Sequence, residues 1–414
     1  MTTIMTIRLP RPRQCEEEYR RVWILLCAGN RIAAIAQLSA FGLSPMKIAK
    51  RTRVTRTDVD AALTIAGSEP AKVATARYHF LDLIQAAAIA EFEDDPEAVK
   101  ALVAAAKTGQ FDHALQRLRD ARAENQRRAD LEDRLRQEGT LLAENPTWQN
   151  KTKYLDDLRT DDREALTIEG HQDCPGHAAC LATQWGYLDP VTGALIDEDV
   201  ETDEDDGEEQ DTARPQWTSL LTIRYVCTDP LQYGHHSRYP DTHTSAARTK
   251  LADMSENEQQ AARAQRRDVI ESNRAWTSAE RVRRTWLRTF VARKTPPKGS
   301  AAFLAEAVAA DADLLARIGG NQLAANILGC EKKGFGRNTQ MATLAAQASE
   351  QRAQVIVLTQ VLAAYEDAAI RDHWRHRAEH TTRYLLFLQT QGYALSNVER
   401  RACGLAPVPD PIEQ

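Results

Sequence analysis

The sequence predicts a mainly α-helical protein with a small β-hairpin module in its middle. Aromatic residues make up only 6% of the 414 residues, while Ala, Arg, Leu and Glu, which favour helices, are plentiful. Apolar residues recur at helical spacing along much of the chain. Between residues 141 and 240 the amino-acid composition changes, and Pro, Gly, His, Cys and Trp become frequent. A chain of this length holds two or three domains.

These changes divide the sequence into four predicted regions. Residues 1–29 give weak signals and are expected to be weakly ordered. Residues 30–138 form a multi-helical domain, 139–250 a small α+β module rich in Cys and His, and 251–414 a helical carboxyl-terminal region. The middle module carries an acidic insert at 196–214, where eleven of the fifteen residues from Asp197 to Asp211 are Asp or Glu. We expect this insert to be disordered.

The first helical region is marked by spacing and by helix-start signals. Apolar residues at positions 32, 35, 38 and 41 lie on one helical face, and Gly42 ends that helix. The sequence Asp94-Asp95-Pro96-Glu97 combines a cap, a first-turn Pro and an acid, which together start a helix. The helices predicted after residue 66 are 71–77, 79–92, 94–107 and 111–138.

Residues 44–66 predict two short helices joined by a tight turn. Ser44 is a good cap for the first helix and Pro45 suits its first position. Thr52-Arg53-Val54 makes the turn, and a capping box of Thr55 and Asp58 starts the second helix. Arg53 stands where such turns usually have a small residue, so it should take an extended or bridge conformation. The residues expected between the helices are Ile48, Ala49, Val54, Val59, Ala62 and Leu63.

This helix-turn-helix pattern is typical of proteins that bind the DNA major groove. Arg56 is the best candidate for reading a guanine, because its guanidinium can donate two parallel hydrogen bonds. The other residues expected to face base edges are Thr55, Thr57, Asp60 and Ala61, and those expected to bind phosphates are Lys47, Lys50, Arg51 and Arg53. The alternative is an ordinary helical hairpin with a basic surface.

The segment LSAFGLSPMKIAKRT at 38–52, followed by TRTDVDAAL at 55–63, resembles the central DNA-binding domain of ParB-type partition proteins. The similarity covers roughly residues 30–125, including the helix start at 93–97. More widely, CPGH at 174–177, YVCTD at 225–229 and the run at 286–295 resemble actinobacterial ParB-like proteins with an extra Cys/His segment. The resemblance implies sequence-specific binding of double-stranded DNA, a homodimer, a possible partition ATPase as partner, and a role in plasmid or chromosome partition or maintenance.

One part of the family pattern is missing. ParB-type proteins place a CTP-hydrolysing domain before the DNA-binding motif. Only about 30 residues precede it here, and they contain neither a Gly-x-Arg-Arg nor a Glu-Asn-x-x-Arg segment. We therefore expect no CTP-driven switching and no enzymatic activity. The alternatives to partition are a stand-alone transcriptional regulator and a helical interaction scaffold that does not bind DNA.

The middle region carries a candidate metal site. Two pairs, Cys174-x-x-His177 and Cys227-x7-His235, flank the predicted strands 179–187 and 219–227. A hairpin that brings the pairs together gives a Cys2His2 set, suited to a structural, tetrahedral zinc ion. A catalytic metal would need an open coordination position, and the sequence has no His-Glu-x-x-His motif. The alternative is buried free cysteines with exposed histidines, and the substitute ligands nearby are His171, Cys180 and His236.

The carboxyl-terminal region is predicted to contain helices 255–273, 277–293 and 299–317, with several more up to residue 402. Arg residues alternate there with Trp276, Trp286 and Phe290, a mixture that can support nucleic-acid contact. However, Trp286, Phe290 and Val291 fall at helical spacing, which favours a core role for the aromatic residues. The Arg residues remain candidates for phosphate contacts, and the region can equally mediate self-association.

The net charge of −6 hides two basic zones beside the acidic insert. Residues 1–60 hold eleven Lys or Arg against five acids, and residues 263–294 hold ten against three.

No apolar run approaches the length of a membrane span, and the amino-terminus lacks a signal-peptide core. An odd number of scattered cysteines, seven, argues against a disulfide framework. We therefore expect a cytoplasmic protein associated with the nucleoid or a plasmid.

Overall fold

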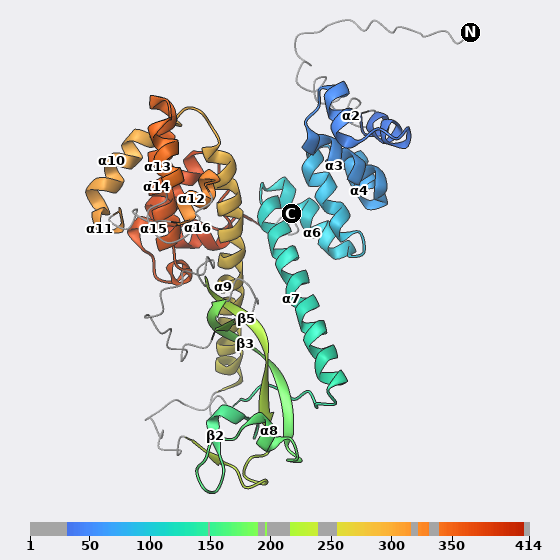
Figure 1. Cartoon of the computed structure of the whole chain (residues 1–414), viewed down its shortest axis with the longest axis vertical. Helices are drawn as coiled ribbons and strands as arrows, with labels where there is room; N and C mark the ends of the chain where they lie inside the picture. The colour runs from blue at the N-terminus through green and yellow to red at the C-terminus, as the bar shows by residue number, and fades with distance from the viewer. Residues whose placement is uncertain are drawn as a thin grey trace, which may run out of the picture. The chain divides into compact units, whose positions relative to one another are not determined.

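A computed structural model describes residues 31–147, 150–188, 195–196, 216–238, 255–315, 322–330 and 339–409. The predicted weakly ordered segment 1–29 lies outside these ranges, as does the acidic insert apart from its first residue. The described chain is mainly helical, with a small antiparallel sheet region in its middle (Figure 1). Contacts divide it into two compact units, residues 1–118 with 388–414, and residues 119–387.

Unit 1 is helical, and two apolar clusters fill it. One, built from the helix at 31–40 and the helices after it, consists of Ile32, Ile35, Ile48, Val59, Ala62, Ile65, Ala71 and Ala86. The other includes Ile89, Phe92, Leu102, Val103 and Phe111. The elements are α2 (Pro45–Thr52), α3 (Arg56–Gly67), α4 (Glu69–Arg77), α5 (Leu83–Ile89), the 3-10 helix η1 (Ala90–Phe92), α6 (Pro96–Lys107), the start of α7 (Phe111–Gln137) and α16 (Asn397–Cys403).

Two expectations about the parts of unit 1 outside α2 and α3 are wrong. The predicted helix 79–92 begins only at Leu83, because Asp82 accepts from the Gln85 N–H at 2.7 Å and the Gln85 side chain accepts from the Asp82 N–H at 3.1 Å. This capping box fixes the helix start. Phe41, placed on the buried face by its spacing, is 80% exposed, since the helix has already ended in a turn there.

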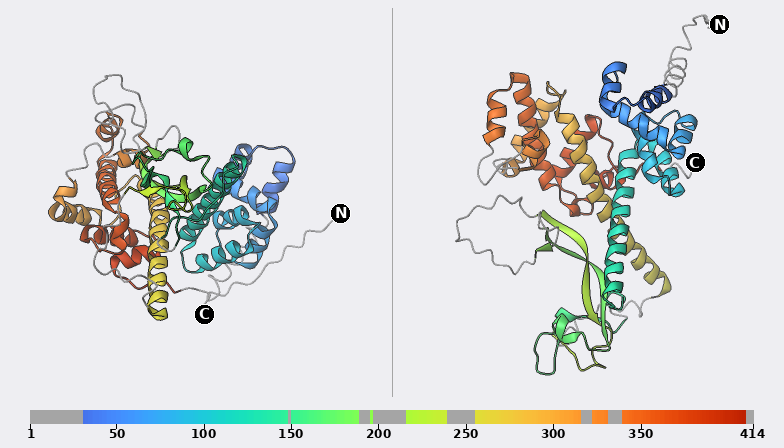
Figure 2. Two further views of the ribbon diagram at one scale, coloured as in Figure 1. Left: turned by 90° about the horizontal axis from the view of Figure 1, so that it is seen from below. Right: turned by 45° about the vertical axis from the view of Figure 1, so that its right-hand side comes forward.

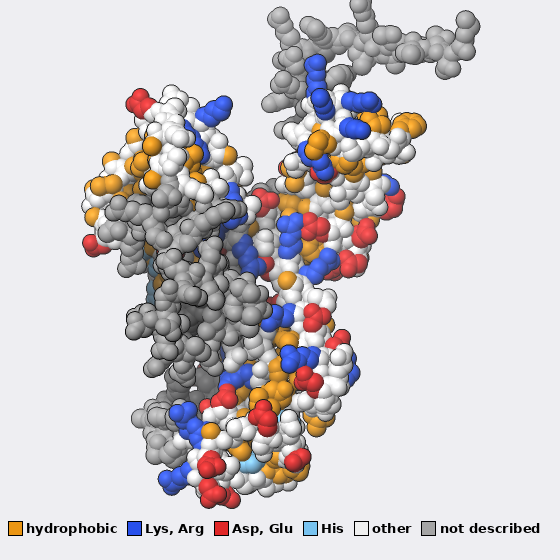
Figure 3. Space-filling view, viewed as in Figure 1, with side chains coloured by type: hydrophobic (Ala, Val, Ile, Leu, Met, Phe, Trp, Pro, Cys, Tyr) orange, Lys and Arg blue, Asp and Glu red, His pale blue; other side chains and the backbone are white. Residues whose placement is uncertain are grey.

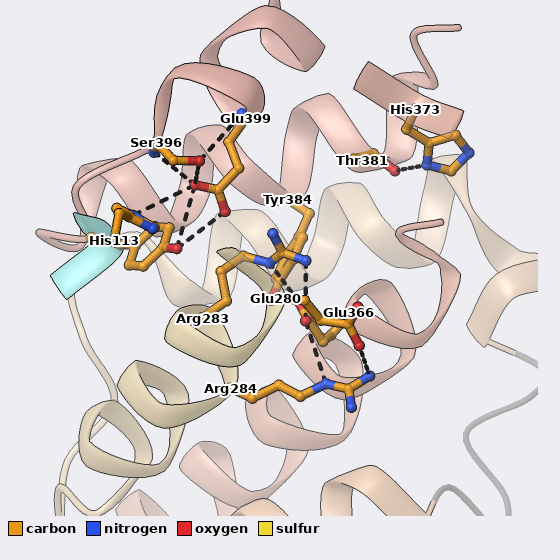
Figure 4. Close-up of polar contacts among 11 residues, drawn as sticks. His113, Glu280, Arg283, Arg284, Glu366, His373, Thr381, Tyr384, Ser396 and Glu399 are labelled. Atoms are coloured by element: carbon orange, nitrogen blue, oxygen red, sulfur yellow. Dashed lines mark hydrogen bonds and ion pairs between the residues drawn. The ribbon is translucent and has the colours of Figure 1, made fainter. Parts of the chain in front are cut away.

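Buried polar contacts attach the carboxyl-terminal segment to α7 within unit 1. The Glu399 side chain is fully buried and accepts from the N–H and hydroxyl of Ser396, at 2.7 and 2.6 Å, and from the Tyr393 hydroxyl at 3.1 Å (Figure 4). Nε2 of His113 lies 2.8 Å from the carbonyl oxygen of Ala394, and the Gln110 side chain donates to the carbonyl of Leu395 at 3.1 Å. Unit 1 therefore combines residues from widely separated parts of the chain.

Unit 2 contains the sheet region, in which the strand order is β1-β5-β3-β4. The long strands β3 (His177–Leu188) and β5 (Gln216–Cys227) are antiparallel, with His177 opposite Cys227. They confirm the predicted strand pair, and each is longer than predicted. Leu131 and Leu135 of α7 pack against Ala179, Leu181 and Leu221 of the pair (Figure 2). The short elements are β1 (Lys153–Tyr154), η2 (Leu155–Asp157), β2 (Leu158–Arg159), α8 (Ile168–His171), β4 (Leu195–Ile196) and β6 (His236–Ser237).

The remaining helices of unit 2 come after the sheet in the chain. They are α9 (Glu256–Val291), α10 (Ser300–Ala310), α11 (Ala312–Leu315), α12 (Gln322–Leu328), α13 (Thr339–Ala346), α14 (Glu350–Ala368), the 3-10 helix η5 (Arg371–Trp374) and α15 (Glu379–Thr390). Across the described ranges, no helix combines the length and apolar character needed to cross a membrane.

Two predicted helix boundaries in unit 2 are wrong. The segments 255–273 and 277–293 form one helix, α9. No Gly or Pro interrupts them, and packing keeps the residues between them helical. Trp276 is buried there, and the Asn273 side chain accepts from the Trp374 indole at 2.9 Å. The predicted helix 299–317 is instead interrupted at Asp311, whose carboxylate binds the Tyr365 hydroxyl and Arg383.

A buried ion pair lies among α9, α14 and α15. Arg283 Nε donates to Glu366 at 2.8 Å, both side chains are fully buried, and the Tyr384 hydroxyl donates to the same carboxylate at 2.8 Å (Figure 4). Burial raises the pKa of Glu366, and the Arg283 charge opposes that rise. Phe290 and Val291 are buried as expected for core residues, and Trp286 is half-buried and stacks on Phe290.

Candidate functional site

Four side chains of unit 2 form a group that can hold a metal ion: His171, Cys174, Cys227 and His235. Each offers one nitrogen or sulfur ligand atom, and these atoms all lie within 4.8 Å of one another. His171 and Cys227 are buried, whereas Cys174 and His235 are half-buried. The ligands come from the end of α8, the turn after it, the end of β5 and the turn before β6.

Local hydrogen bonds place each ligand. Thr167 caps α8 by accepting from the Gly170 N–H at 3.0 Å, and the N–H of Cys174 then bonds the carbonyl of His171 at 3.1 Å. Cys227 ends β5, between β1 and β3. The N–H of His235 bonds the carbonyl of Pro230 at 2.8 Å, which closes a turn that presents His235 to the same point.

Both cysteines accept a hydrogen bond from the backbone N–H two residues later. The Gly176 N–H donates to Cys174 Sγ at 3.4 Å, and the Asp229 N–H donates to Cys227. Such bonds stabilise a thiolate, the form that binds metals. The close packing at position 176 leaves room only for glycine. A Cβ there would lie 2.6 Å from the Tyr233 ring and 2.8 Å from Cys227 Sγ.

One pair of ligand atoms in the group has the separation expected around a tetrahedral ion. Cys174 Sγ lies 3.5 Å from His235 Nε2. Zinc bonds of about 2.3 Å to sulfur and about 2.05 Å to nitrogen, at tetrahedral angles, place sulfur and nitrogen about 3.5 Å apart. This pair of atoms therefore already has the separation that a shared zinc ion would impose.

His171 occupies the position for which the sequence favoured His177. His171 Nε2 is buried and has no hydrogen-bond partner in the described part of the chain, while its Nδ1 lies 3.0 Å from Nδ1 of His177. The His177 ring stacks on Tyr225, with the ring centres 5.5 Å apart, and lies beside the four-residue group. Spacing could not choose between the two, since His171-x-x-Cys174 and Cys174-x-x-His177 are equivalent patterns.

The other two substitute ligands lie outside the group. Cys180 is buried with Ala178 and Val226. His236 is exposed and pairs with Asp161, with 2.7 Å between Nε2 and the carboxylate. The sequence had named three of the four clustered residues as ligands and the fourth, His171, only as a substitute.

Burial sets the protonation of the group. It lowers the pKa of His171 to about 4, with His235 and His177 adding to the effect, and it also lowers the pKa of His235. Both imidazoles are therefore neutral at physiological pH, with a lone pair available. Burial raises the pKa of Cys227 to about 12, opposed by the Asp229 N–H and helped by Cys174. A metal must therefore displace the Cys227 proton when it binds.

A second candidate site lies on α2 and α3 in unit 1, which are joined by residues 53–55. Ile48 and Val59 are fully buried and hold the two helices together. The Thr55 hydroxyl accepts from the Asp58 N–H at 3.1 Å, which is one half of the predicted capping box. Of the nine residues predicted to face DNA, eight are exposed, namely Lys47, Lys50, Arg51, Arg53, Thr55, Arg56, Thr57 and Asp60. Lys and Arg side chains gather over this end of unit 1 (Figure 3).

Three details of this helix pair correct the sequence-based expectations. Ala61 is buried rather than outward-facing. Ser44 makes no side-chain cap bond, and only its carbonyl oxygen accepts, from the Ile48 N–H at 3.0 Å. Arg53 is neither extended nor in the bridge region, because the short turn forces it into the left-handed conformation, at φ 55° and ψ 31°. This conformation costs a residue with a Cβ about 1 kcal/mol.

Arg56 already has a partner within α3. Its Nε lies 2.8 and 3.0 Å from the two carboxylate oxygens of Asp60, one helical turn away. The two side chains are 53% and 49% exposed, and exposed pairs of this kind contribute less than about 1 kcal/mol. The pair therefore orients Arg56 but is weak enough for a stronger acceptor to replace Asp60.

The chain matches no known protein family, no curated protein and no solved structure.

Proposed function

We propose that α2 and α3 form a helix-turn-helix that binds double-stranded DNA sequence-specifically, with the start of α3 in the major groove. The observation that supports this most is the common exposure of the eight polar and basic residues on a helix pair locked by Ile48 and Val59. Residues at the start of such a second helix reach base edges, and basic neighbours bind phosphates.

In this proposal Arg56 exchanges Asp60 for the N7 and O6 acceptors of a guanine. Both contacts to Asp60 come from Nε alone, whereas a guanine accepts two parallel hydrogen bonds from the guanidinium, so the exchange loses little. Lys47, Lys50, Arg51 and Arg53 supply the salt-dependent affinity that does not depend on sequence. The resemblance of residues 30–125 to ParB-type proteins makes plasmid or chromosome partition our preferred role, with two copies of the chain on paired half-sites. A transcriptional regulator is the second candidate.

We propose further that the metal is zinc and that it is structural. Two sulfur and two nitrogen ligands are the donor set that tetrahedral zinc prefers among the common divalent metals. Four protein ligands leave no open position for a substrate, so the ion would stabilise the fold rather than catalyse a reaction. Elemental analysis of the purified chain, with Cys174→Ser as the comparison, tests for the ion.

DNA binding is tested with sites that the protein itself selects from a random library, in a gel-shift series over increasing salt. Affinity should fall steeply with salt. Arg56→Ala should weaken binding to the selected site by about 1–3 kcal/mol, and Lys50→Ala should weaken binding to all sequences and reduce the salt slope by about one. Lys100→Ala, an exposed α6 residue paired with Glu97, is the control. Unchanged binding by both test variants would refute this assignment of the site, whereas no DNA binding by the unaltered chain would support the scaffold role.

The positions of the bound sites in the genome separate the two DNA-binding roles. A few clustered repeats near a replication or partition locus support partition. Sites dispersed among promoters support a transcriptional regulator. The same map tests the proposed dimer, because two copies of a helix-turn-helix require half-sites about one helical turn apart, about 34 Å, or a multiple of that distance.

A further inference from the structure

We propose that His177 is a positioning residue of the metal centre: its Nδ1 accepts the Nδ1 proton of His171 and so directs Nε2 of His171 at the metal. This inference rests on the metal centre proposed above. The sequence favoured His177 as a metal ligand. In this proposal His177 instead forms a hydrogen bond to the ligand His171 and does not bind the ion itself.

The assignment follows from counting protons on the two rings. A neutral imidazole has one N–H and one lone pair, and the 3.0 Å separation of the two Nδ1 atoms requires one to donate and the other to accept. If His177 donated, His171 would carry its own proton on Nε2. That atom is buried and has no acceptor among the residues that the structure describes, which would cost about 1–3 kcal/mol. With the proton on Nδ1, Nε2 instead offers a lone pair among the other ligands.

The same strand pairing that places Cys227 also holds the His177 ring. His177 begins β3 directly opposite Cys227, and its ring stacks on that of Tyr225 at an interplanar angle of 24°. The His171 ring lies against both neighbours, with ring centres 5.2 Å from His177 and 4.9 Å from His235. Metal-binding histidines usually donate their second N–H to such a fixed partner, which selects the tautomer and the ring orientation.

The test compares zinc affinity, by competition with a chromophoric chelator, and the absorption spectrum of the cobalt-loaded full chain. His177→Phe keeps a stacking ring but removes the acceptor, and should lower zinc affinity about 10–100-fold. Its cobalt spectrum should still show two sulfur and two nitrogen ligands. His177→Gln, which restores an acceptor, should recover most of the affinity. His171→Phe should lose a nitrogen ligand, and His236→Phe, a control outside the group, should change neither measurement.

Two results would overturn the assignment. Unchanged affinity in His177→Phe would remove any role for His177. A missing nitrogen ligand in His177→Phe, with an intact spectrum in His171→Phe, would make His177 the ligand. A wild-type chain that binds neither zinc nor cobalt would instead refute the metal centre itself. Nitrogen-proton correlation spectra of the zinc-loaded chain give a second measurement, since the His171 proton should be on Nδ1.

Discussion

Residues 31–118 and residues 150–238 differ in what fills their interiors. The first region has continuous apolar clusters that draw on almost every helix in it. In its described residues the second has three small clusters beside a group of Cys and His side chains. Their buried members are Ala179, Leu181 and Leu221 with Leu135 of α7, then Leu155, Leu158 and Cys227, and then Ala178, Cys180 and Val226. Segments with so little apolar surface commonly depend on a bound ion. The comparison indicates that unit 1 is stabilised by burial, and under the metal centre proposed above the Cys/His segment is stabilised by ligation.

Metal removal should separate the two regions most strongly. Structural zinc contributes about 10–16 kcal/mol in small domains, far more than the clusters of the Cys/His segment can replace. A chelator should therefore abolish amide protection in residues 150–188 and 216–238 and leave it in 31–118, as measured by hydrogen exchange with mass spectrometry. Cys227→Ser should have the same effect and Cys403→Ser should not. Equal protection of both regions after chelation would contradict the comparison.

A core truncation in unit 1 should give the opposite pattern. Ile48 lies on the buried face of α2, and its side chain is fully buried. Ile48→Ala leaves a cavity there, so it should reduce the free energy of unfolding of residues 31–118 by about 2–5 kcal/mol. Metal affinity should not change. Met46→Ala, at a position that is 69% exposed, should change stability by less than about 0.5 kcal/mol. A large effect of Ile48→Ala on zinc affinity would show that the regions are not independent.

Gly176→Ala tests whether the Cys/His segment needs close packing around its ligands. The new Cβ would meet the Tyr233 ring and Cys227 Sγ, so we expect a loss of about 1–3 kcal/mol in metal-binding free energy. Gly67→Ala at the end of α3 is the matched control, because nothing lies within 4 Å of its Cβ. That change should stabilise unit 1 by about 0.4–1 kcal/mol. Chelator competition and hydrogen exchange measure the two effects.

Metal affinity should depend on pH, whereas the stability of residues 31–118 should depend on it far less. The pKa of Cys227 is raised to about 12, so its thiol releases a proton whenever a metal binds near neutral pH. The pKa of His171 is lowered to about 4, so this ring adds no proton competition above pH 6.5. Between pH 6.5 and 8 the zinc affinity should rise at least about tenfold per pH unit, or about 1.4 kcal/mol. A flat profile would exclude thiolate ligation.

Arg53→Gly should have the smallest effect and should stabilise unit 1. Glycine takes the left-handed conformation without the Cβ penalty, so we expect a gain of up to about 1 kcal/mol. Arg51→Gly, inside α2, should instead destabilise by about 1 kcal/mol. Hydrogen exchange of residues 31–118 measures both. If Arg53 contacts a phosphate as proposed, Arg53→Gly should weaken DNA binding while it stabilises the fold.

Features set by neighbouring residues could be predicted from the sequence. Asp95 and Pro96 marked the start of α6, and the predicted strand pair was found with extended ends. Contacts between distant residues could not be predicted. Asp311 interrupts a helical pattern because it binds Tyr365 and Arg383, and nothing local predicts that break. The choice between His171 and His177 also depends on β3 pairing with β5, since their spacing from Cys174 is the same.

The attachment of the carboxyl-terminal segment to α7 has a consequence for protein synthesis. Gln110 and His113 find their partners in Ala394 and Leu395, which leave the ribosome some 280 residues later. Until then the amino-terminal helices lack the buried Tyr393, Val398 and Glu399 that complete their unit. A growing chain therefore carries an unfinished unit 1 while about 280 further residues are made. The finished unit becomes available only after this carboxyl-terminal segment has been made.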